Sequence, residues 1–316
     1  MKAASRTELT ELDWARIQWL REIFSDGVPG DTTRVSELCA VARQALRAGD
    51  RDLALNLLLG AALRCWWADT GPAARRLVTA ALGEVSHAAG DPRCIAALAV
   101  AEPVLQCGAV MDLLSGFAVT DVHDGDALRL LGMAAHAIGD TVRSVDYLSR
   151  AEAVLRDQGR LGLLSQVLSM QVIDSLELGD WVRAAAAAEE GKRLAEETGQ
   201  PIWRAGTLVC DAMNSAFRGD VRQAFAHAAE VEFLSARQRL NDLLSCVQLV
   251  RGAALVATEQ HAAAYAQLRR LFEPSDRAST SASVSTGSCS LPTRRSRQAS
   301  ARTPATCCAT SMPSRP

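Results

Sequence analysis

A Gly-Asp pair that recurs every 40 residues constrains the fold of this chain more than any other feature. The pairs are Gly139-Asp140, Gly179-Asp180 and Gly219-Asp220, and one more step of 40 residues reaches Glu259-Gln260, where the downstream pattern continues. Glycine adopts a positive φ that ends one helix, and aspartate caps the start of the next. Each pair therefore predicts a tight turn between two helices.

Small and apolar residues keep the same register on both sides of these turns. A small residue follows each Asp position by four: Ser144, Ala184, Ala224 and Ala264. Two apolar columns precede the turns: Leu130, Met170, Cys210 and Val250, then Met133, Ile173, Met213 and Ala253. A spacing of three places both columns on one helix face, and a small residue lets two helices cross closely. The pattern predicts helix pairs of about 40 residues that stack into an all-α superhelix.

The composition agrees with a helical, globular chain. Of its 316 residues 48% are hydrophobic, 22% are charged and only 4% are aromatic, and the net charge is -2. Strands are normally enriched in aromatic and β-branched residues, so this composition favours helices. No apolar run is long enough to span a membrane, and residues 1–11 lack the apolar stretch of a signal peptide. We therefore expect a cytoplasmic protein without membrane contact.

Three regions are predicted. In residues 1–31 a capping box at Thr10-Glu11-Leu12-Asp13 opens a helix to about Phe24, and a Gly/Pro loop follows. Residues 32–276 form the helical-repeat domain, which begins with an amphipathic stripe: Val35, Leu38, Cys39, Ala42, Ala45 and Leu46. Residues 277–316 form a tail rich in Ser, Thr, Arg and Pro.

The tail differs from the rest of the chain in charge. It holds six Arg and no acidic residue, whereas residues 1–276 hold 28 basic and 36 acidic residues. Six Arg could neutralise phosphates, but no aromatic side chain is present to stack on a base, so disorder is the favoured interpretation. Arg, Ser, Thr, Pro, Ala and Cys are also what a shifted reading frame of a GC-rich gene yields. We therefore predict that the tail is translated out of frame.

Two resemblances follow from these patterns. The fragments 48–54, 178–184 and 218–224 resemble the x-G-D-x-x-x-A turn of tetratricopeptide repeats, although a period of about 40 exceeds their 34 residues. Residues 12–276 resemble the helical-repeat region of large ATP-binding LuxR-type regulators related to the maltose-regulon activator. The segments that carry this resemblance are residues 19–24, 27–31 and 55–67 together with the Gly-Asp repeats.

That resemblance implies a helical-repeat sensor or scaffold from a regulator that also has an ATPase and a DNA-binding helix-turn-helix. This chain shows neither motif. Its closest approach to a phosphate-binding loop, residues 186–193, lies within a predicted helix. We expect a protein that is not an enzyme, has no cofactor, and binds a protein or a small effector on its concave face, without specific nucleic-acid binding. The alternatives are a frameshifted remnant without function and an independent protein-binding adaptor.

Few residues are candidates for a site. Trp67, Trp181 and Trp203 could line a ligand groove, although packing in a core made of Ala and Leu is the favoured alternative. Asp121, His123, Asp124 and Asp126 lack the spacing of an EF-hand and are interpreted as a solvated loop, so no metal site is predicted. The nine Cys contain no C-x-x-C pair, which argues against zinc or a redox dithiol.

Overall fold

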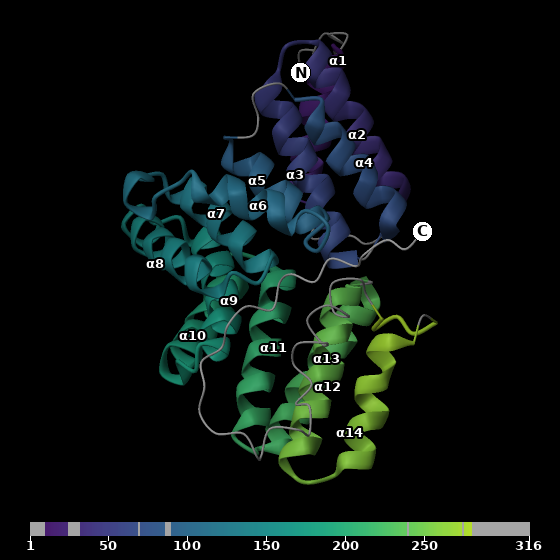
Figure 1. Cartoon of the computed structure of the whole chain (residues 1–316), viewed down its shortest axis with the longest axis vertical. Coiled ribbons are helices and arrows are strands. Elements are labelled where there is room, and N and C mark those ends of the chain that lie inside the picture. The colour runs from purple at the N-terminus through teal and green to yellow at the C-terminus, as the bar shows by residue number, and fades with distance from the viewer. Residues whose placement is uncertain are drawn as a thin grey trace, which may run out of the picture.

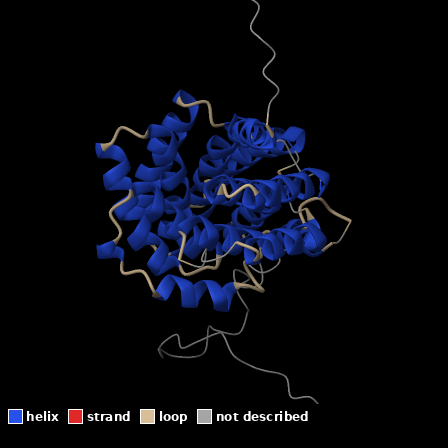
Figure 2. Cartoon of the chain, turned by 90° about the horizontal axis from the view of Figure 1, so that it is seen from above, coloured by secondary structure: helices blue, strands red, loops and turns tan. Residues whose placement is uncertain are grey.

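The computed structural model describes residues 10–24, 32–68, 70–85, 90–238, 240–273 and 275–279. Within these ranges the chain forms fourteen α-helices, two short 3-10 helices and no strand (Figure 2). The helices are α1 (Glu11–Phe24), α2 (Thr32–Arg47), α3 (Arg51–Ala68), α4 (Gly71–Gly83), α5 (Pro92–Ala101), α6 (Cys107–Ser115), η1 (Val119–Asp121), α7 (Gly125–Ala137), α8 (Thr141–Asp157), α9 (Leu161–Glu177), α10 (Trp181–Glu197), α11 (Pro201–Phe217), α12 (Val221–Gln238), α13 (Asn241–Ala257), α14 (His261–Leu268) and η2 (Arg269–Phe272). The predicted all-α superhelix is confirmed.

The odd-numbered helices from α3 to α13 form the inner layer of this superhelix. Each of them contacts the next odd-numbered helix, and an even-numbered helix packs beside each. In Figure 1 the chain passes from α1–α4 at the top, past α7–α10 on the left, to α11–α14 at the bottom. The path turns back on itself, because α13 contacts α3.

Direct contacts join the two ends of this path. The Asn241 side-chain amide on α13 donates a hydrogen bond of 3.2 Å to the carbonyl oxygen of Ala68 at the end of α3. The indole rings of Trp67 and Trp203 meet edge to face, with 5.4 Å between their centroids. The inner helices therefore close into a ring.

The turns that shape the superhelix recur every 20 residues, which is half the period evident in the sequence. Positive φ angles occur at Gly139, Gly159, Gly179, Gly199 and Gly219, and each helix from α8 to α11 has 17 residues. The N–H group that follows each glycine donates to the carbonyl six positions back in the turn, as in the 2.9 Å bond that closes the turn at Gly139. Only every second turn carries Asp after Gly, so the sequence displays 40.

The predicted capping role of aspartate is confirmed. Four side chains each accept a hydrogen bond from the backbone N–H three residues later: Asp50, Asp140, Asp180 and Asp220. Each such cap contributes about 1 kcal/mol to helix stability. The predicted capping box also forms at the start of α1, where Thr10 Oγ1 accepts from the N–H of Asp13 at 3.2 Å and Asp13 accepts from the N–H of Thr10 at 3.0 Å.

Glu259 occupies the glycine position of the turn before α14, at a φ of 61°. A residue with a Cβ atom pays about 1–2 kcal/mol in this left-handed region, partly offset by the greater chain entropy of glycine in the unfolded state. We expect Glu259→Gly to raise the free energy of unfolding by about 0.5–1 kcal/mol, as measured by urea unfolding. Glu259→Ala keeps the Cβ atom and is the control that should bring no gain. Equal stabilisation by both variants would contradict the left-handed turn.

The small residues that follow the turns pack where helices cross. Ser144, Ala184, Ala224 and Ala264 are all buried, as the sequence pattern predicted. A second close contact lies on the facing helix of the pair. A Cβ atom built on Gly132 would lie 2.5 Å from Leu148 Cδ2, and one built on Gly252 would lie 2.5 Å from Leu268 Cδ2. A glycine on the inner helix thus makes room for a leucine on the outer helix.

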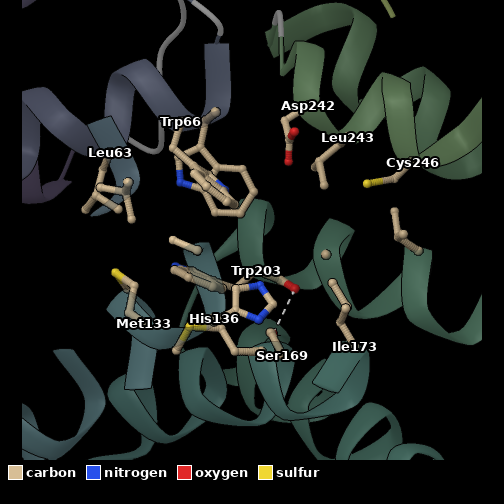
Figure 3. A pocket seen from close by; sticks show the side chains of 16 residues that line it. Leu63, Trp66, Met133, His136, Ser169, Ile173, Trp203, Asp242, Leu243 and Cys246 are labelled. Carbon is tan, nitrogen blue, oxygen red and sulfur yellow. Dashed lines mark hydrogen bonds between the residues drawn. The ribbon is translucent and has the colours of Figure 1, made fainter. Parts of the chain in front are cut away.

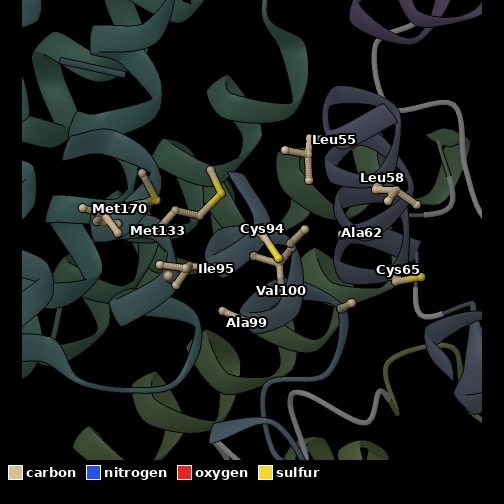
Figure 4. Packing of buried hydrophobic residues seen from close by; sticks show 14 of the residues in the cluster. Leu55, Leu58, Ala62, Cys65, Cys94, Ile95, Ala99, Val100, Met133 and Met170 are labelled. Carbon is tan, nitrogen blue, oxygen red and sulfur yellow. The ribbon is translucent and has the colours of Figure 1, made fainter. Parts of the chain in front are cut away.

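The interior divides into two apolar clusters. The first runs from α1 to α10, and Figure 4 shows its path from Leu55 and Leu58 on α3 through Ile95 on α5 to Met133 and Met170. The second is built from α11, α12 and α13. Trp67 of α3 packs against the second cluster, and Trp203 of α11 packs against the first. The two indoles therefore join the clusters at the ring closure.

The ends of the array extend past its predicted boundaries. Helix α1 contacts α2 and α3, so part of the predicted region 1–31 packs on the repeat domain. After α14, Ser245 Oγ donates a 2.5 Å hydrogen bond to the carbonyl oxygen of Ala278, which is buried. The loop 25–31 and residues 280–316, which carry the predictions of disorder and of a shifted frame, lie outside the described residues. In the described part of the chain, no helix is both long and apolar enough to cross a bilayer.

Candidate functional site

A cavity lies at the centre of the ring, and all six inner helices line it (Figure 3). The centre of a water-sized sphere can occupy about 80 Å³ of it, and its total empty space including the open mouth is about 670 Å³. Its lining consists of Leu63, Trp66, Trp67, Val100, Met133, His136, Ala137, Ser169, Met170, Ile173, Trp203, Gly206, Val209, Asp242, Leu243 and Cys246. The walls are therefore mostly apolar and aromatic, as in many small-molecule sites.

The structure brings together two of the three tryptophans that the sequence singled out. Trp67 and Trp203 both line the cavity and contact each other, and Trp66 lines it as well. Trp181 does not belong to this lining: it lies on α10, is 38% exposed and packs edge to face on Phe217 at 5.6 Å. The predicted ligand-lining role therefore has a matching cavity for Trp67 and Trp203, and none for Trp181.

A buried polar network forms the wall of the cavity on the side of α7. The Nδ1 atom of His136 lies 2.8 Å from one carboxylate oxygen of Asp174, and Ser144 Oγ donates to the other at 2.6 Å. Asp174 is 2% exposed, and His136 reaches the cavity surface. The carboxylate thus lies between the serine and the histidine. In a nucleophilic triad the histidine stands between them, so this network does not present the serine hydroxyl to a base.

Sequence reasoning missed this network, although the repeats contain a signal for it. Forty residues before Asp174 the repeat has Ala134, and forty residues after His136 it has Leu176. Ser144 likewise stands in a column that is otherwise alanine. Three polar residues thus replace apolar residues in neighbouring helices, and a simultaneous departure from the pattern is the signal that could have linked them.

The surroundings of His136 favour its protonated form. Burial lowers the pKa of the ring, but the carboxylates of Asp174, Glu177 and Asp242 together raise it more, so the pKa lies above its ordinary value of 6.5. A protonated His136 shares its proton with Asp174 and places a positive charge beside two acidic residues. The network is therefore an ion pair at the wall of the cavity.

This ion pair makes stability depend on pH. Because the folded pKa of His136 lies above 6.5, its contribution is fully present below pH 6.5 and is lost as pH rises through the folded value. We expect the free energy of unfolding to fall more between about pH 6 and about pH 9 in the unmodified protein than in His136→Gln. Urea unfolding at both pH values measures the difference, and identical pH profiles would contradict the assignment.

The remaining polar groups of the lining are few. Asp242 stands in the first turn of α13, and in Figure 3 its carboxylate points into the space across from His136. Ser169 Oγ donates to the carbonyl oxygen of Ser165 at 3.0 Å. Burial raises the pKa of the Cys246 thiol well above its usual value, so this sulfur is not a thiolate. The cavity therefore offers an aromatic surface and charge, but no activated nucleophile among its described lining residues.

The acidic loop before α7 has structural roles. Asp124 caps α7 by accepting from the N–H of Ala127 at 2.8 Å, and Asp126 forms a 2.6 Å ion pair with Arg129. No group of three or more potential metal ligands occurs among the described residues. Residues 186–193, which come closest to a phosphate-binding loop, lie inside α10 and are helical. Four cysteines are buried as predicted: Cys39, Cys65, Cys94 and Cys210.

Comparison with known proteins gives no family assignment, because no family model matches the chain and no curated protein matches its sequence.

Proposed function

We propose that this chain is a non-catalytic helical-repeat sensor that binds a small effector in its central cavity. The observation that carries the proposal is the convergence of six inner helices on one aromatic cavity at the ring closure. Stacked helix pairs supply a curved surface without chemistry of its own, so binding is the usual role of such repeats.

A small molecule fits this concave face better than a protein segment does. In an open superhelix the inner helices line a groove along which a peptide can lie. Here α13 returns to α3, and Asn241 and Trp67 tie the two ends together. The enclosed space of about 670 Å³ is within the range of small-molecule pockets.

The position of the cavity suggests how binding is sensed. A ligand between Trp67 and Trp203 touches both apolar clusters at once, since each indole packs against the cluster of the other. Such a ligand binds the closed ring more tightly than an opened one and so shifts the population toward closure. In the LuxR-type regulators that the sequence resembles, we propose that this closure is the signal passed to neighbouring domains.

Thermal unfolding with and without small-molecule fractions of a cell extract tests the proposal. A ligand present at about 100 times its Kd stabilises the folded state by about 2.7 kcal/mol. We expect a saturable rise in Tm for the unmodified protein and for Trp181→Ala, and a much smaller rise for Trp67→Ala. Trp181→Ala is the matched control because it removes an indole outside the cavity.

Two results would contradict the proposal. If no fraction stabilises the protein and it aggregates instead, the alternative of a remnant without function is favoured. If the same fraction stabilises Trp67→Ala fully, the ligand binds elsewhere, as an adaptor with a different surface would require.

A further inference from the structure

The walls of the central cavity combine indole rings with negative charge. Trp66, Trp67 and Trp203 line it, and the face of an indole is the aromatic surface that attracts cations most strongly. Asp242 approaches from α13, opposite the wall that holds His136 (Figure 3). Aromatic rings beside a carboxylate are the surroundings in which proteins bind substituted ammonium groups.

The balance of charge favours a cation over an anion. Asp242 lies in the lining, and Asp174 lies behind His136 at 2.8 Å. Among the described residues of the lining there is no Lys or Arg, so the one cationic side chain at the wall is His136, which Asp174 already pairs. An anionic ligand would meet repulsion from two carboxylates, whereas a cation is attracted to both.

The shortage of polar side chains argues against a sugar or another polyhydroxylated ligand. Such a ligand needs a hydrogen-bonding partner for each buried hydroxyl group. Ser169 is the hydroxyl residue of the lining, and its Oγ atom already donates to Ser165 and lies 3.4 Å from the carbonyl oxygen of Trp203. A ligand with an apolar exterior and one positive charge makes no such demand.

We propose that the effector is a compact organic cation, of the substituted-ammonium class, held between the indoles and Asp242. This inference rests on the proposed function, because it names the chemical class that the same cavity binds. The requirement on Asp242 is that it carries its charge at the wall, whatever other contacts it makes. Attraction to the indole faces supplies affinity, and the carboxylates select charge.

Choline and its neutral isostere 3,3-dimethyl-1-butanol test the inference, because they differ in charge but hardly in shape. Tryptophan fluorescence of the full chain reports binding of each. We expect choline to bind about tenfold more tightly than the isostere. In Asp242→Asn the affinity for choline should fall about tenfold while the affinity for the isostere stays the same, which also shows that the variant is folded. Trp181→Ala should leave both affinities unchanged.

The outcomes separate this inference from the proposed function. Equal affinity for both compounds overturns the cation class and leaves the cavity as a binding site. Absence of choline binding, together with stabilisation by extract fractions that depends on Trp67, also overturns the class alone. Absence of both effects overturns the inference and the proposed function together.

Discussion

Replacing Gly132 with valine is expected to lower the free energy of unfolding by about 2–3 kcal/mol through overpacking. A Cβ atom at this position would lie 2.5 Å from Leu148 Cδ2 and 2.7 Å from its Cγ atom. Leu148 is fully buried and has no open space into which to move. Helix α7 or α8 must therefore shift, and urea unfolding measures the cost.

The neighbouring repeat suggests the control for this prediction. Forty residues later the equivalent pair is Val172 and Ala188, with the large and small side chains exchanged and both buried. Leu148→Ala alone should cost about 2–5 kcal/mol through the cavity it leaves. The double variant Gly132→Val with Leu148→Ala copies the neighbouring pair, so its cost should fall below the sum by at least about 1 kcal/mol. Strict additivity would refute the idea that these pairs compensate in size.

Asp174→Ala is expected to destabilise the fold by about 3–5 kcal/mol, the largest effect of a single substitution that we predict. The change removes the acceptor of both His136 and Ser144 and leaves a buried imidazole without its ion-pair partner. Losing one member of a buried charge pair costs more than replacing the whole pair with apolar groups.

The repeat also supplies the control here. The triple variant Ser144→Ala, Asp174→Ala and His136→Leu restores the residues that neighbouring units carry at these positions. We expect it to recover most of the lost stability, because it leaves no unpaired polar group from the network. If the triple variant is as unstable as Asp174→Ala, lost packing volume and not the unpaired charge explains the effect.

The sequence was sufficient to predict the helices and their turns, because both depend on local chemistry. Gly179-Asp180 ends one helix and caps the next through bonds within a few residues. The buried small column, as at Ala184, was also predictable from its spacing. The 20-residue period was less evident, because Gly159 is followed by Arg160 and not by aspartate.

The cavity was not predictable, because it depends on how far each helix pair rotates against the next. That rotation accumulates from contacts such as Gly132 with Leu148, whose partners lie on different helices. The sequence could therefore nominate Trp67 and Trp203 by residue type, but it could not show that residues 136 positions apart would meet. It nominated Trp181 on the same grounds, and the structure places that residue on an outer helix.

Ring closure changes what the number of repeats means for this molecule. In an open array, a duplicated helix pair lengthens the binding surface and leaves the existing surface intact. Here α13 meets α3, so an added pair would separate Asn241 from Ala68 and Trp203 from Trp67. The cavity would change in shape and lining instead of gaining a further binding position. Copy number is thus a determinant of ligand selectivity in this ring, and it can evolve only in steps that rebuild the pocket.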